Sequence, residues 1–195
     1  SMAAGELPQV VGHVAQTGGT HGTMCAEVVA DVAPGARILP VVGDSFAQVQ
    51  ALAKKIVAGN PDAIEVVSHS VIWLGMGFGR HEGPACAVTD LVRGAGVAWV
   101  NAAGNSSGGQ FYSGVYTDAD KDGLHDFQPG EPHLTFVQGN GGTIELSFDW
   151  DDYAGRTQDF DLLLYRKTET DWELVGESRN KHGTYQPPFE QIGLD

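Results

Sequence analysis

The chain has 195 residues, of which 42% are hydrophobic, with 27 glycines and a formal net charge of -14. This composition is typical of a folded globular protein with many turns, built as one or two compact units, and excludes a disordered tail. The negative charge of the chain repels phosphate backbones and anionic lipid, so we expect no nucleic acid partner. Because the chain also has no apolar run long enough to cross a bilayer, we expect no membrane partner either.

The first part of the chain alternates predicted helices with predicted strands. Apolar residues recur at helical spacing in three segments, and Ser45 can cap the second of them. Short apolar runs lie between these segments. This alternation predicts an α/β unit with a parallel sheet and flanking helices. The predicted helices cover 22–32, 45–59 and 84–93, and the predicted strands cover 36–42, 63–70 and 97–102.

The pattern changes after residue 114 to acidic, glycine-rich turns and short alternating runs. The runs over 143–150 and 160–165 predict antiparallel strands of a β-sandwich-like module. We therefore predict a partial α/β domain over 1–114 and an acidic loop with a partial β-module over 115–195, with the boundary near 112–118.

Two short motifs of the first part could carry chemistry. Residues 19–23 (Gly-Thr-His-Gly-Thr) place His21 at the start of a predicted helix between small residues, where other groups can approach a general base. Residues 101–105 (Asn-Ala-Ala-Gly-Asn) follow a predicted strand, and Asn105 could donate its side-chain amide to an oxyanion. Taken singly, a lone histidine is usually structural and Gly-Asn is often only a turn.

Together these motifs resemble the middle of a subtilisin-like serine protease domain. His-Gly-Thr opens a helix, Ala-Pro-Gly-Ala precedes a strand and Ala-Ala-Gly-Asn follows a later strand, over roughly residues 18–114. The resemblance implies that His21 is the general base and acid, that Asn105 is an oxyanion donor and that the strand around Ser70 lines the substrate cleft. It also implies a secreted endopeptidase that cleaves polypeptides through an acyl-enzyme and needs no cofactor for catalysis.

The chain departs from this family in two ways. Subtilisin-like enzymes carry aspartate, histidine and serine in that order, yet the first aspartate here is Asp31, which follows His21. No Gly-Thr-Ser nucleophile segment occurs. We therefore expect the catalytic aspartate and serine to lie outside the chain, the chain alone to be inactive, and its incomplete sheet to expose apolar surface and self-associate.

A different enzyme class is suggested by residues 104–108 (Gly-Asn-Ser-Ser-Gly), which fit the nucleophile elbow of α/β-hydrolases. That elbow opens a helix. The glycine-rich run that follows here has no helical periodicity, which disfavours a hydrolase of this class.

The acidic loop carries a candidate calcium site. Asp118, Asp120 and Asp122 alternate along the chain and Gly123 follows them, as in loops that wrap calcium with oxygen ligands. The loop is not a complete EF-hand, because the twelfth position is Pro129. A structural calcium site and a solvated acidic turn both remain open.

The acidic residues and apolar strands after residue 147 resemble small β-sandwich modules of secreted bacterial proteases. This favours an inserted, stabilising module, and leaves as alternative a noncatalytic calcium- or surface-binding module on a degenerate subtilase scaffold. Cys25 and Cys86 could form one disulfide or remain buried thiols. The remaining histidines have no metal-binding spacing: His13, His69, His81, His125, His133 and His182.

Overall fold

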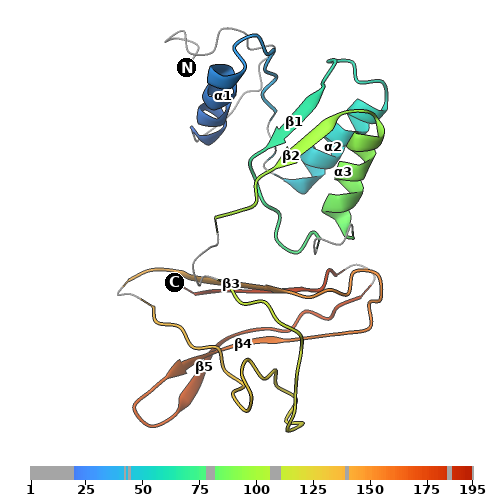
Figure 1. Cartoon of the computed structure of the whole chain (residues 1–195). Helices are drawn as coiled ribbons and strands as arrows, with labels where there is room; N and C mark the ends of the chain where they lie inside the picture. The colour runs from blue at the N-terminus through green and yellow to red at the C-terminus, as the bar shows by residue number, and fades with distance from the viewer. Residues whose placement is uncertain are drawn as a thin grey trace. The chain divides into compact units, whose positions relative to one another are not determined.

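The structure, a computed structural model, describes residues 20–41, 43, 45–77, 82–105, 111–138, 141–183 and 186–194. The chain divides into two compact units, Ser1–Ala103 and Gly104–Asp195, so the division comes earlier than expected. Helices and strands are mixed, with one small parallel sheet and antiparallel sheets, which confirms the α/β class (Figure 1). Among the described residues no helix has the length and apolar character that crossing a membrane requires.

Among the described residues, three helices and two strands lie in the first unit and four strands in the second. The elements in chain order are α1 (His21–Val32), α2 (Phe46–Val57), β1 (Val66–His69), α3 (Pro84–Gly94), β2 (Ala98–Asn101), β3 (Ile144–Asp149), β4 (Leu162–Lys167), β5 (Trp172–Ser178) and β6 (Phe189–Leu194). All three helices lie close to their predicted ranges, because caps and apolar spacing are local signals.

The core of the first unit lies between helices α2 and α3 and one face of the parallel pair β1–β2. Figure 1 shows the two helices side by side along this pair. In α2 the apolar residues return to the same face every three or four positions, as a helix requires. Ser45 caps that helix, and its backbone N–H donates to the Gln48 side chain at 3.1 Å. The buried core residues are Val49, Ala53, Ile56, Val67, Val88, Val92 and Val97.

Several apolar side chains of the first unit stay exposed among the described residues. Val66 and Val100, on the sheet face opposite the core, are each 58% exposed. The predicted apolar stripe of α1 is also open, with Met24 51%, Val28 62% and Val32 83% exposed. Parallel sheets are usually covered on both faces, so the described part of this unit covers one side only.

The predicted strand over 36–42 is wrong for the part that the structure describes. Residues 36–41 form no strand, and only Ile38 takes part in an isolated bridge. The apolar run contains Pro40, which has no N–H to donate to a ladder. Val42 lies outside the described residues.

Two antiparallel pairs build the second unit. β3 pairs with β6, and β4 pairs with β5 across a register shift between Leu164 and Tyr165. Strand β6 contacts both β4 and β5, so the two pairs share a core that includes Trp150, Leu164 and Ile192. The predicted strands 143–150 and 160–165 correspond to β3 and β4, whereas β5 and β6 lack a clear sequence signal.

Glu190 is a fully buried carboxylate on β6. The Ser178 hydroxyl donates to its Oε2. Asn180 donates twice, from its backbone N–H to Oε1 at 2.6 Å and from Nδ2 to Oε2 at 2.8 Å. Because buried charge is costly unless it is hydrogen-bonded, these donors explain how the core tolerates the carboxylate.

Candidate functional site

His21 is the first residue of α1, and it is exposed. The helix begins there because Thr20 is the N-cap, whose carbonyl accepts from the Met24 N–H at 2.9 Å. Nε2 of His21 lies 3.2 Å from the carbonyl oxygen of Ser70, 49 residues further along the chain. The structure therefore brings together two of the residues predicted for the site.

This contact fixes the role of Nε2 in the His21 ring. A carbonyl oxygen can only accept, so Nε2 carries the proton when it bonds to Ser70. The same Nε2 lies 3.7 Å from Sγ of Cys25, which is one helical turn later and on the same face. In this tautomer Nε2 donates a hydrogen bond and cannot accept a proton from a nucleophile.

A polar network holds the segment that carries Ser70. His69 and Asn101 are register partners at the ends of β1 and β2, and His69 Nδ1 lies 2.6 Å from Asn101 Oδ1. The Trp73 indole donates to His69 Nε2 at 3.2 Å, and Asn101 Nδ2 donates to the Val71 carbonyl at 3.4 Å. These bonds hold residues 70–73 against the end of β2.

The sequence interpretation missed this network. Its signal was present, because both polar residues end the short apolar runs that were predicted to be strands, and the carboxyl ends of parallel strands meet at one edge of a sheet.

Asn105 follows β2 at the start of the second unit, while His21 and Ser70 belong to the first. It is exposed, and Gly104 before it has φ 89°. Glycine suits that backbone conformation, because a Cβ would be strained there. Residues 106–110, which include both serines of the elbow-like pattern, lie outside the described residues.

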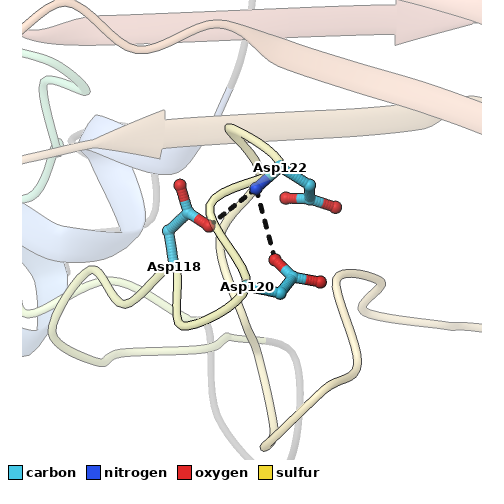
Figure 2. Close-up of side chains that lie close together, drawn as sticks. All are labelled: Asp118, Asp120 and Asp122. Atoms are coloured by element: carbon cyan, nitrogen blue, oxygen red, sulfur yellow. Dashed lines mark hydrogen bonds between the residues drawn. The ribbon is translucent and has the colours of Figure 1, made fainter.

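The predicted calcium ligands lie together in the acidic loop. Figure 2 shows a carboxylate oxygen of Asp118 and one of Asp120 directed at the backbone nitrogen of Asp122. The candidate ligand oxygens of the three aspartates lie within 4.8 Å of one another. The backbone N–H of Asp122 donates to Asp118 Oδ1 at 3.1 Å and to Asp120 Oδ1 at 3.3 Å. Gly123, at φ 87°, donates to Asp118 Oδ2 at 3.2 Å. Carboxylate oxygens at this spacing are the kind of ligand that calcium takes.

A buried carboxylate outside the aspartate trio accepts a hydrogen bond from the backbone of this loop. Asp126 is 9% exposed, and its Oδ2 accepts from the Ala119 N–H at 2.8 Å. Tyr116 lies at the entry to the loop. Desolvation, and then the negative charges of Asp118 and Asp122, raise the pKa of its phenol. The loop is therefore a region of concentrated negative charge.

The two cysteines are free, partly buried thiols, so the disulfide alternative is wrong. Among the described residues the aspartate trio is the one group of His, Cys, Asp or Glu side chains placed to hold a metal ion. His13 and His81 lie outside the described residues.

The chain was also compared with models of protein families, with curated proteins and with solved structures. None of the three comparisons finds a match.

Proposed function

We propose that the chain is part of a subtilisin-like serine endopeptidase, in which it supplies the general base and an oxyanion donor. The contact of His21 Nε2 with the Ser70 carbonyl, at 3.2 Å, carries this proposal. It supports the proposal because an exposed histidine at a helix start is held against the carboxyl end of a parallel strand. Open α/β sheets bind their ligands at such strand ends.

In the proposed reaction a serine attacks the peptide carbonyl, and His21 accepts the serine proton and later donates it to the leaving amine. Asn105 donates its side-chain amide to the oxyanion of the tetrahedral intermediate. No aspartate precedes His21 and no Gly-Thr-Ser segment occurs, so the nucleophile and the orienting carboxylate would come from other parts of the parent protein. The substrate would be an extracellular polypeptide.

The tautomer of His21 gives a physical reason to expect the chain alone to be inactive. A carboxylate bound to Nδ1 stabilises the ring with its proton on that nitrogen, which leaves Nε2 free to accept the serine proton. In this chain Nε2 instead donates to Ser70. Adding the aspartate would therefore convert the ring from a donor at Nε2 to a base at Nε2.

The experiment is to express the full-length coding sequence and label the protein with a fluorophosphonate probe that reacts with activated serines. We expect labelling of the parent protein, and loss of labelling in His21→Ala but not in a matched variant of an exposed histidine, His133→Ala. Asn105→Ala should lower turnover about 100- to 1000-fold, a figure that comes from subtilisin itself rather than from this chain. A folded parent protein that takes no label would overturn the proposal.

The aspartate trio favours a second candidate, a noncatalytic module that binds calcium or a surface. Calorimetric titration of the chain with calcium tests it. Asp120→Asn should weaken binding, whereas Glu169→Gln, which removes the same charge from an exposed position, should not. A titration without heat at millimolar calcium, where even weak extracellular modules bind, would reject calcium as a ligand.

A further inference from the structure

Two tyrosines near the start of the second unit lie against one histidine and leave much of their own surface exposed. The ring centroid of His125 lies 5.7 Å from that of Tyr112 and 5.6 Å from that of Tyr116, which stacks on the imidazole at an interplanar angle of 26°. Tyr112 is 42% exposed and Tyr116 is 46% exposed. We call these three residues the aromatic surface.

The rings of the aromatic surface are held in place by the residues beneath them. Tyr112 meets Phe127 edge to face at 5.0 Å between ring centroids, and its hydroxyl lies 3.0 Å from Nε2 of His125. Tyr116 packs against Phe160 at 4.9 Å between ring centroids. Aromatic rings that are fixed before binding lose little conformational entropy when a partner docks on them. The aromatic surface is therefore suited to binding.

The chain directly after Tyr116 is strongly acidic. Residues 116–126 contain four aspartates, one lysine and no arginine. Three of these aspartates form the trio, whose candidate ligand oxygens lie within 4.8 Å of one another. The charges of Asp118 and Asp122 reach the aromatic surface, because they contribute, after desolvation, to the raised pKa of the Tyr116 phenol. An exposed aromatic surface therefore adjoins a concentration of negative charge.

The two features together favour a planar cation as the ligand. A cation above the face of a tyrosine ring is attracted by the ring quadrupole. The guanidinium group of arginine also stacks on aromatic rings and pairs with carboxylates through two N–H groups, whereas the lysine ammonium is a compact and strongly hydrated charge. A neutral sugar could stack on the rings but would gain nothing from the negative charge of the aspartates, and an anionic partner would be repelled by it.

We propose that the aromatic surface and the aspartate trio form a docking site for an arginine-rich polypeptide segment of another protein. Arginine side chains of that segment stack on Tyr112 and Tyr116, and neighbouring guanidinium groups pair with the aspartates. Charge complementarity selects this partner over neutral and acidic ones. The proposal goes beyond the endopeptidase function, because the docking site lies wholly within the second unit and needs neither His21 nor a nucleophile.

The test is a fluorescence-anisotropy titration of the whole chain with a short labelled peptide of alternating arginine and glycine. A calcium chelator in the buffer keeps calcium off the aspartates. We expect binding that weakens as salt is added, because salt screens the charges. The matching peptide of lysine and glycine should bind more weakly. No binding of the arginine peptide, or equal binding of the two peptides, would overturn the proposal, since equal binding indicates only general attraction to an acidic chain.

Substitutions separate the contribution of the rings from that of the charges. Tyr112→Leu and Tyr116→Leu should each weaken binding of the arginine peptide about two- to fivefold. The control is Tyr165→Leu on β4, which removes a tyrosine that is 40% exposed and should leave binding unchanged. Asp120→Asn should weaken binding by up to about fivefold, whereas the exposed Glu169→Gln should not. Losses in the two controls as large as in the other variants would contradict a localised site.

A readout on the wild-type chain decides the question even where a variant does not fold. In nuclear magnetic resonance spectra the ring C–H signals of Tyr112, Tyr116 and His125 should shift when the arginine peptide is added, while those of Tyr165 should not. Peptide binding without shifts at the aromatic surface would overturn the proposal. If the neutral oligosaccharide cellohexaose shifted the same signals and displaced the peptide, the site would belong to a glycan, and the polypeptide partner would be wrong.

Discussion

The two units differ in what they bury. In the described residues of the first unit every buried side chain is apolar, and one sheet face and half of the residues of α1 stay exposed. In the second unit, the described residues include four buried polar or charged ones, Asp126, Asp152, Ser178 and Glu190. The first unit should therefore depend on apolar packing and apolar partners, and the second on hydrogen bonds and pH.

The largest effect should come from the core of the first unit. Ile56 is 2% exposed, and Ile56→Ala should lower the free energy of unfolding by about 2–5 kcal/mol. Far-ultraviolet circular dichroism in urea follows this unit, because all described helices lie in it. The neighbouring Val57→Ala is the control, since Val57 is 49% exposed. Equal losses in the two variants would contradict the position of the core.

A smaller effect is expected from the buried carboxylate of the second unit. Glu190→Gln replaces one acceptor oxygen by an amide donor facing other donors, and should cost about 1–3 kcal/mol. Indole fluorescence in urea measures this loss, and the exposed Glu169→Gln is the control. If the glutamine variant were as stable as the wild type, the network around Glu190 would not support the fold.

Acidification should change the stability of the second unit through its aspartates. The depressed pKa of Asp152 gives stability that is present above about pH 3.9, the usual value of an unfolded aspartate, and is lost as pH falls through the folded value. We expect Asp152→Asn to remove part of the acid loss seen by fluorescence. Burial raises the pKa of Asp149, so Asp149→Asn should act in the opposite direction, by stabilising the second unit most at neutral pH. If the wild type, Asp152→Asn and Asp149→Asn had the same stability at every pH, both effects would be ruled out.

The smallest effect on stability is expected on the open face of the β1–β2 pair. Val100→Thr should change the free energy of unfolding by no more than about 0.5 kcal/mol, because the side chain is exposed. It should nevertheless reduce the self-association that we expect from this face. Light scattering over a range of concentrations measures that association, and a monodisperse monomer in the wild type would remove the basis for the expectation.

The sequence predicted those parts of the fold that local signals determine. Ser45 and the spacing of Val49, Ala53 and Ile56 define α2 before any partner is known. Strands depend on distant partners. The run over 36–41 is apolar but forms no ladder, while β6 carries Glu190, which would be read as exposed without knowledge of Ser178 and Asn180.

The candidate site, like the fold, was predictable only where its sequence signal is local. The motif around His21 and the spacing of Asp118, Asp120 and Asp122 are local, and the aspartates do lie together. The family resemblance placed Ser70 in the substrate cleft, but the contact of its carbonyl with His21 was not predicted, because a backbone carbonyl carries no sequence signal of its own. The network of His69 and Asn101 needed the register of two strands.

Gly176 on β5 has no unusual backbone torsion, yet a Cβ built on it would lie 2.8 Å from Cγ2 of Ile192 on β6. The distance between the two strand pairs therefore depends on the combined side-chain volume of residues 176 and 192. Alanine at 176 would normally suit a strand better than glycine, and it should be accepted here only together with a smaller residue at 192. A library randomised at both positions and selected for folding should return correlated pairs, with their summed side-chain volume held nearly constant.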